Sequence, residues 1–210
     1  MFEAIKGYAL LIVFGLGSPF GINLGTEQPK YRVRETLNGE VEVREYAERI
    51  AAEVTVDAHT SDKARSEGFN TLAGYIFGKN KQKQSIAMTS PVEINSKGRS
   101  IAMTSPVEVN ARGGLMTMRF FMPAAYSMAE LPQPADPRVK LVEVPRATVA
   151  ALRYSGSTED ANTKAKTVAL LDRLKSSQWK VAGPSKAFFY NPAWTIPFLR
   201  RNEVLVEVTR

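Results

Sequence analysis

The sequence predicts an α+β domain in which a mostly antiparallel sheet, or an open barrel, carries two main helices on its outside. Two observations predict this class. Alternating apolar and polar residues, typical of half-buried strands, recur along most of the chain after residue 30. Two other segments, beginning near residues 61 and 158, carry apolar residues at helical spacing, and strands precede and follow each of them. The chain therefore divides into two similar strand–helix–strand halves.

The first half opens with a predicted hairpin and a third strand. Segment 31–46 alternates on both sides of Asn38 and Gly39, which is the strongest short-range signal for a tight turn between two strands. Segment 49–56 (RIAAEVTV) contains more apolar residues and predicts a more buried strand. The chain then turns toward the first helix.

That helix is predicted to begin at residue 61. Ser61 and Asp62 can cap its N-terminus, and Gly78 is suited to follow its last turn, because glycine readily adopts the left-handed conformation required there. Its apolar stripe, which we expect to face the sheet, contains Ala64, Gly68, Phe69, Leu72, Ala73 and Ile76.

A short apolar segment then occurs twice. The residues IAMTSPVE at 86–93 return unchanged at 101–108. Each copy predicts a strand that stops, or lies at a sheet edge, at its proline, because proline cannot donate to a ladder. One interpretation is a strand–loop–strand pair that packs in the core. The other is that Met88 and Met103 form an adaptable wall against a flat apolar ligand, since thioethers are polarizable and flexible.

The second half repeats the pattern of the first. Strands are predicted over 115–123, 139–144, 148–154, 179–190 and 203–208. A helix that opens at 158–160 is expected to carry five apolar residues inward, namely Ala161, Ala165, Val168, Leu171 and Leu174. A loop with the sequence NPAWTIPFLRRN separates the last two strands.

Composition limits the classes of function. The net charge of +7 favours an anionic partner, with a generally basic surface as the alternative. Nucleic acid is not expected, because the chain has no zinc-finger spacing, basic helix or recognisable RNA-binding aromatic pair. The chain has no cysteine and one histidine, which excludes disulfides and the usual nucleophile–base pairs. We therefore do not expect an enzyme.

The N-terminal segment 1–29 differs from the rest of the chain. It carries no charged residue from Gly7 through Thr26, and its most apolar part is about as long as the core of a signal peptide. We expect a signal peptide or membrane anchor, so that the protein is exported, periplasmic or attached to a membrane, and a folded domain over 30–210. The alternative is an apolar arm that packs on the protein itself in the cytoplasm.

Several longer motifs carry a resemblance to a known family. They are VEVREY at 41–46, GFNTLAGYIFGKNKQKQSIAMTSPV at 68–92, MRFFMP at 118–123, LPQPADPRV at 131–139, and YNPAW with RRNEV within 190–204. Together they resemble the SOUL haem-binding protein family, in its prokaryotic form with a second IAMTSPV element. The resemblance implies a distorted β-barrel of two βαββ-like halves with the helices outside. The second copy would then be an insertion that adds a strand.

The resemblance also implies a shallow apolar groove for haem or a related tetrapyrrole. It places the groove near Arg65, Phe69 and Leu72 on the first helix and near Trp194 and Thr195 in the late loop. Lys79, Lys81, Lys83 or Arg65 could meet a haem propionate, and Met88 could line the wall. The alternatives are core packing for Phe69 and Leu72 and a solvated face for the lysines.

This chain differs from the family at the position of the axial haem ligand. Members reported to ligate haem through histidine carry it at the position of Glu45 in this chain, and the single histidine here, His59, lies elsewhere. The resemblance therefore implies haem binding without a histidine ligand, with Tyr46 and Tyr75 as weaker candidates. We expect non-enzymatic binding that serves transport, buffering or sensing. The alternatives are an enzyme acting on tetrapyrroles and an interaction module that binds an apolar peptide or lipid.

Overall fold

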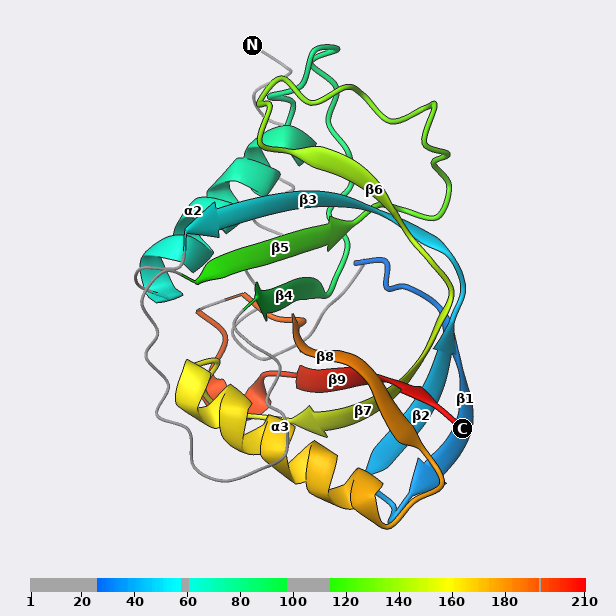
Figure 1. The fold of residues 1–210 in the computed structure, drawn as a ribbon. Helices are drawn as coiled ribbons and strands as arrows, with labels where there is room; N and C mark the ends of the chain where they lie inside the picture. Colours follow the sequence, from blue (N-terminus) through cyan, green and yellow to red (C-terminus); the bar gives the residue numbers. More distant parts are fainter. Residues whose placement is uncertain (1–25, 58–60, 98–113, 193) are drawn as a thin grey trace.

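The computed structural model describes residues 26–57, 61–97, 114–192 and 194–210. Within these ranges, nine strands form one antiparallel sheet in the order β1-β2-β7-β9-β8-β4-β5-β3-β6 (Figure 1). The strands are β1 (Tyr31–Leu37), β2 (Val41–Tyr46), β3 (Arg49–Asp57), β4 (Val92–Lys97), β5 (Leu115–Phe121), β6 (Lys140–Val144), β7 (Ala147–Tyr154), β8 (Lys180–Phe189) and β9 (Asn202–Thr209). The helices are α2 (Ser61–Ile76), α3 (Asp160–Lys175) and the short 3-10 helix η1 (Pro197–Leu199).

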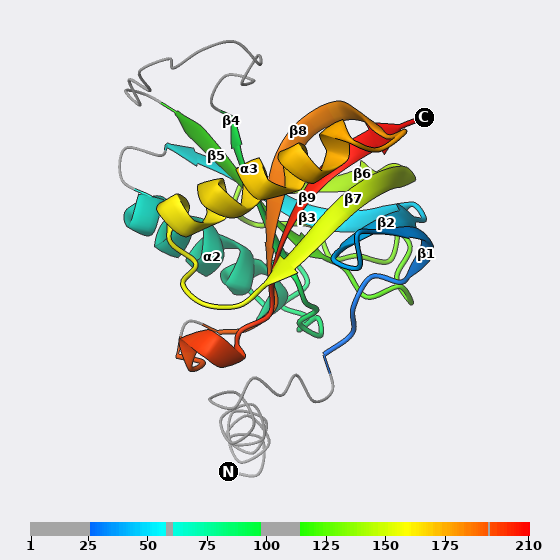
Figure 2. The same ribbon diagram turned by 90° about the horizontal axis from the view of Figure 1, so that it is seen from below.

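The sheet consists of two βαββ halves that exchange strands. The first half is β3-α2-β4-β5, in which β5 pairs with both β3 and β4. The second half is β7-α3-β8-β9, in which β9 pairs with both β7 and β8. The two halves join at the centre of the sheet, where β4 pairs with β8. β2 leads into β3 but pairs with β7, whereas β6 leads into β7 but pairs with β3. Both helices cover the same face of the sheet (Figure 2). The α+β class with two main helices is confirmed.

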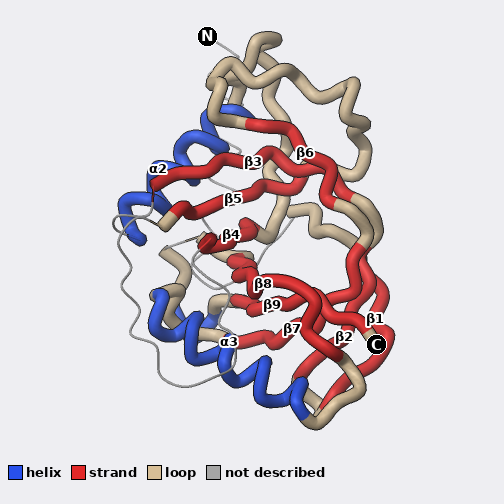
Figure 3. Tube along the Cα trace, in the orientation of Figure 1, coloured by secondary structure: helices blue, strands red, loops and turns tan. Residues whose placement is uncertain are grey.

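The sheet does not close into the barrel implied by the family resemblance. Its strong curvature brings the two halves toward each other (Figure 3). In the described residues, β1 pairs only with β2 and β6 pairs only with β3, so these two strands are the edges of the sheet. Closure needs a ladder that continues around the whole ring, and none joins β1 to β6 in this part of the chain.

The first hairpin forms as predicted. Asn38 and Gly39 have φ angles of 49° and 71°, and the backbone N–H of Glu40 donates to the carbonyl of Leu37 at 3.1 Å. Positive φ at both central residues is the signature of a type I′ turn, whose twist matches that of the flanking strands.

Replacing Gly39 with alanine is expected to lower the free energy of unfolding by about 1 kcal/mol, because an L side chain is strained at positive φ. Space is not the cause, since a Cβ at Gly39 would contact nothing within 4 Å. Gly114→Ala is the matched control: its Cβ also has open space, and its φ is not positive. Equal effects of the two substitutions in urea denaturation would contradict this account of the turn.

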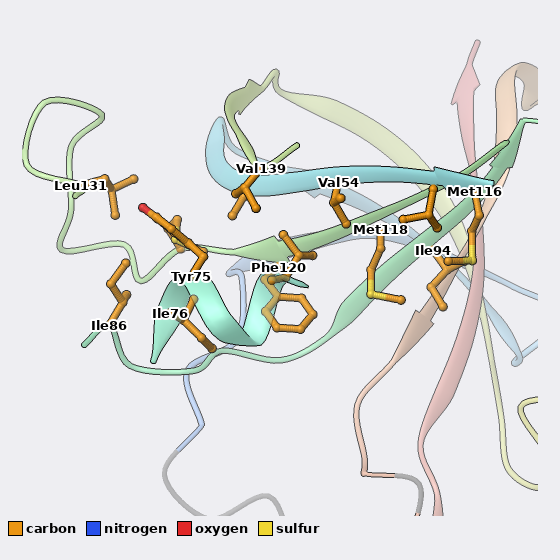
Figure 4. Close-up of a cluster of buried hydrophobic side chains, with 14 of the residues drawn as sticks. Val54, Tyr75, Ile76, Ile86, Ile94, Met116, Met118, Phe120, Leu131 and Val139 are labelled. Atoms are coloured by element: carbon orange, nitrogen blue, oxygen red, sulfur yellow. The ribbon is translucent and has the colours of Figure 1, made fainter. Parts of the chain in front are cut away.

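Helix α2 packs its predicted stripe on β3 and β5. Leu72 and Ile76 are buried together with Val54, Met118 and Phe120 of the sheet, in the core cluster that Figure 4 shows. Leucine and isoleucine side chains at this spacing remove an apolar stripe of the helix from water, which is the main favourable term in folding.

Helix α3 is rotated about its own axis relative to the prediction, so that a different face packs on the sheet. Leu170 and Leu174 are its buried residues, whereas Ala161, Ala165 and Val168 are exposed, so the predicted inward positions of these three were wrong. The two leucines contribute more apolar area than two alanines and a valine, and they determine which face packs on β7–β9. The hydroxyls of Thr163 and Tyr154, 3.1 Å apart, fix the same orientation near the start of the helix.

The first copy of the repeated segment is not the predicted strand. Residues 86–91 form a connection, and β4 begins at Val92, so Pro91 precedes the ladder instead of ending it. The connection is held by other bonds: the N–H of Ile86 donates to the carbonyl of Ile76 at 2.7 Å, and Thr89 donates to the carbonyl of Phe121. The second copy, 101–108, lies outside the described residues, so the added strand stays a prediction.

The described residues begin inside the segment assigned to the N-terminus. The N–H groups of Ala124 and Ser90 donate to Glu27, and Arg201 donates to Gln28 at 3.2 Å, so these positions contact the folded domain. Residues 1–25 lie outside the described part. Among the helices that are described, none is both long and apolar enough to cross a membrane.

Candidate functional site

A partly exposed apolar surface lies between the two helices, over the central strands β4 and β8. Sheet register places Phe120, Val92 and Phe189 in one row across β5, β4 and β8, and Val92 and Phe189 remain partly accessible. Phe69 of α2 packs edge-on against Phe120, with ring centroids 5.3 Å apart, and leaves 39% of its surface exposed. We call Phe69, Val92 and Phe189 the inter-helix surface.

The late loop extends this surface beyond the end of β8. Trp194 and Phe198 are 67% and 72% exposed, and Leu199 is also exposed. The loop is anchored near the start of α3, because the N–H of Gly156 donates to the carbonyl of Pro197 at 2.9 Å. Figures 1 and 2 both place η1 on the side of the molecule where α2 and α3 begin. Exposed aromatic residues gathered in this way mark a binding surface more often than chance exposure.

Arg65 joins the two helices at this surface. Its Nη1 donates to the carbonyl of Thr158 at 2.6 Å, and its Nη2 forms an ion pair with Asp160 at the start of α3. Its guanidinium also lies 5.7 Å from the ring centroid of Phe189. Arg65, one of the residues predicted to meet a haem propionate, is therefore already paired within the protein.

The structure brings only some of the predicted site residues together. Arg65 and Phe69 lie in the first half of α2, on the side of the late loop that carries Trp194. Lys79 follows the other end of this helix, and the span from Arg65 to the last helical residue is about 16 Å. Lys79 instead lines a cavity of about 330 Å³ beside α2, together with Glu67, Asp136 and Arg138.

Three other predicted residues contribute little exposed surface. Leu72 is fully buried in the core, in agreement with the alternative of core packing, and Thr195 is buried in the late loop. Met88 is partly buried and packs against the same core as Leu72. Contact of these residues with a ligand stays a prediction.

The two tyrosines considered as metal ligands are unsuited to that role. Tyr75 donates its hydroxyl to the carbonyl of Pro132 at 2.8 Å, and burial raises the pKa of its phenol to about 12. Tyr46 is buried, and this burial raises its pKa as well, although Arg44 opposes the shift. A tyrosine binds iron as a phenolate, and the raised pKa at both positions disfavours loss of the phenolic proton. His59 lies outside the described residues.

A second cavity, which sequence reasoning missed, lies on the sheet face away from the helices. It measures about 300 Å³ and is lined by Tyr46, Arg49, Glu93, Asn95, Arg119 and Phe188, among others. The signal in the sequence was the alternation of charged with apolar residues along β3 and β5, which predicts two different faces. The sequence alone does not show which of these charges lacks a partner, because that depends on the register in which the strands pair.

These features define a class: a two-repeat α+β domain with an apolar, aromatic surface between its helices. The family model described as "SOUL heme-binding protein" matches residues 26–207. The chain belongs to the SOUL haem-binding protein family. Heme-binding protein 2 of Mus musculus is 25% identical over 184 residues, which cover 85% of this chain and 84% of the mouse protein.

Solved structures share the fold at low sequence identity. The crystal structure of the EcmrR C-terminal domain has a TM-score of 0.56 at 7% identity and covers 86% of this chain and 98% of that domain. An uncharacterized conserved protein from Listeria innocua has a TM-score of 0.57 at 14% identity, with 81% and 92% of the two chains covered. A hydrolase from Listeria innocua has a TM-score of 0.53 at 13% identity, with 81% and 92% covered. These likenesses concern the fold alone.

Proposed function

We propose that this protein binds haem or a related tetrapyrrole, without turning it over, on the inter-helix surface and the adjoining late loop. The observation that carries the proposal is the exposed aromatic surface formed by Phe69, Trp194 and Phe198 in a chain of the SOUL family. A porphyrin is a flat apolar disc, and aromatic side chains bury a large area against such a ligand with little loss of conformational freedom.

The residues fit the macrocycle better than its metal. Bound haem would supply an iron centre and the associated visible absorbance. Among the described candidates, Tyr46 and Tyr75 are buried as phenols. The haem would therefore be held mainly by apolar contact, and its propionates would stay near solvent because Arg65 is paired with Asp160. Transport, buffering and sensing are all compatible with such a site.

A haem titration of the full chain tests the proposal. We expect a saturable shift of the Soret band with one haem per protein. Absorbance that rises without saturation would contradict the proposal and favour the alternative of an apolar peptide or lipid ligand. Loss of the pigment during incubation with a reductant would favour an enzyme acting on tetrapyrroles instead.

Replacing His59 with alanine is expected to leave both the Soret maximum and the haem affinity unchanged. The reason is that Glu45 occupies the family's histidine position and that the proposed site depends on apolar contact. The measurement is the same titration on the variant. A shifted Soret maximum or lost saturation would identify His59 as a ligand and contradict the account.

A further inference from the structure

The cavity on the sheet face away from the helices is separate from the proposed haem site. Successive residues of a strand point to opposite faces. Glu93 and Phe188 line this cavity, whereas their neighbours Val92 and Phe189 belong to the inter-helix surface on the other side. The sheet itself therefore lies between the two sites.

Arg49 stacks on aromatic rings at this cavity but has no hydrogen-bond partner among the described residues. Its guanidinium stacks on two rings, with its Cζ 4.3 Å from the centroid of Tyr46 and 4.8 Å from that of Phe121. Its Nε and Nη1 are buried and have no acceptor within the described parts of the chain. Burying charged donors without acceptors is costly, and an anion supplied by a ligand would offset that cost.

The same cavity is lined by a second group that has no partner in the described parts of the chain. The Oδ1 of Asn95 is buried and receives no hydrogen bond from any described residue. Of the four buried side-chain polar atoms without partners in the described residues, three belong to Arg49 and Asn95. Polar atoms whose hydrogen bonding a polar ligand would complete are thus concentrated in the wall of one cavity.

The other buried or half-buried charges of the wall already have partners. Arg119 donates to Glu53 at 2.7 Å and to Glu93 at 3.0 Å. Lys186 pairs with Glu207 at 2.8 Å. Glu143 and Arg146, at the rim, are exposed and opposite in sign. Among the buried or half-buried cations of this wall that the structure describes, only Arg49 is thus left without a carboxylate partner, and the nearby carboxylates would repel a second negative charge.

The wall also has an apolar part. Val144, Phe188 and Leu205 are buried residues of one core cluster, and all three line the cavity. A ligand that fills the cavity must therefore present apolar surface as well as its anionic group, because inorganic anions would leave this wall without contact.

We propose that this cavity binds a small organic monocarboxylate with an apolar body. The carboxylate accepts hydrogen bonds from the fork of Arg49, a geometry that a planar guanidinium matches well. The apolar body lies against Phe188 and Leu205, and an N–H or O–H group of the ligand donates to Asn95. This site is additional to the proposed haem site and does not depend on it.

Calorimetric titration of the full chain with 4-hydroxybenzoate and with its methyl ester tests the site. We expect saturable binding of the acid with one molecule per protein. The ester, which lacks the charge, should bind about tenfold more weakly or worse, and Arg49→Gln should weaken binding of the acid to a similar extent. Arg138→Gln is the matched control, because Arg138 lines the other cavity and is paired with Asp136 and Glu67. It should leave binding unchanged.

Four results would overturn the proposal: no saturable binding of the acid, equal binding of acid and ester, no effect of Arg49→Gln, or tighter binding of inorganic phosphate than of the acid. If Arg49→Gln does not fold, Arg49→Lys keeps the charge, loses the fork and should still weaken binding. The Soret titration of the Arg49 variants should match that of the unaltered protein. Failure of this site is thereby distinguished from failure of the proposed haem binding.

Discussion

Replacing Glu203 with alanine is expected to destabilise the protein by roughly 3–5 kcal/mol, because it removes the buried carboxylate shared by Arg44 and Arg201 and leaves the buried Arg44 with only the more exposed Glu42 as a counter-ion. Glu203 is 0% exposed and accepts hydrogen bonds from Arg44 at 2.7 Å, from Arg201 at 2.8 Å and from Tyr190 at 2.8 Å. Arg44 is itself buried and lies 4.3 Å from the ring centroid of Tyr31. Urea denaturation at neutral pH measures the loss.

Glu45→Ala is the matched control for this substitution. Glu45 also pairs with two arginines, Arg32 at 2.7 Å and Arg34 at 2.8 Å, but on the exposed surface of the first hairpin. Surface pairs of this kind contribute little, because water and salt screen them. We therefore expect almost no change for Glu45→Ala, and similar losses in the two variants would contradict the importance of burial.

The Glu203 network also predicts a pH dependence. Burial alone would raise the pKa of Glu203, but its bonds to Arg44 and Arg201 outweigh burial, so the pKa lies below its ordinary value of 4.5. A carboxylate with a lowered folded-state pKa contributes stability above its unfolded-state pKa and loses that contribution as the pH falls through the folded-state value. The unaltered protein should therefore lose stability more steeply below about pH 4.5 than Glu203→Ala does. Parallel losses would contradict the lowered pKa.

The second large effect is expected at the proposed haem site. Trp194→Ser should weaken haem binding about tenfold or more, because burial of a large aromatic side chain against a ligand contributes on the order of 2 kcal/mol. Trp194 is 67% exposed, so the substitution should leave the thermal stability of the protein without haem unchanged. The Soret titration and a melting curve measure the two quantities separately.

Phe77→Ser provides the control for Trp194→Ser. Phe77 is 63% exposed, a similar fraction, but it lies just beyond the other end of α2, away from the late loop. This variant should bind haem as the unaltered protein does. If both substitutions weaken haem binding equally, the surface at the start of α2 is not the site, and nonspecific apolar adsorption becomes the better explanation.

Local signals in the sequence were sufficient for much of the fold. The Asn38-Gly39 pair fixed the first hairpin, because positive φ is needed there, and the stripe of α2 correctly placed Leu72 and Ile76 in the core. The rotation of α3 was missed, because alanine and valine at helical spacing compete with leucines whose greater area decides the packing. The strand exchange between the halves depends on long-range pairing, which no local pattern encodes.

For the candidate sites too, residues within a recognisable motif were predictable from the sequence, whereas contacts between distant segments were not. Phe69 and Trp194 were identified through the family resemblance and remain partly exposed. The pairing of Arg65 with Asp160 was not predictable, because it joins two helices that are distant in sequence. Arg49 was missed for a similar reason. Its lack of a partner becomes visible only after the sheet register has paired Arg119 with Glu53 and Glu93.

The most direct test of the proposed haem site is the location of bound haem on the protein. Amide NMR spectra of the full chain should be recorded with ferric protoporphyrin and with its zinc analogue, which lacks the paramagnetic centre. If haem binds between α2 and the late loop, the ferric form will selectively broaden amides of the first half of α2 and of residues 194–199, and will spare Lys79 and Arg49. Broadening centred on Arg49 or Lys79, or spread evenly over the protein, would contradict binding between α2 and the late loop.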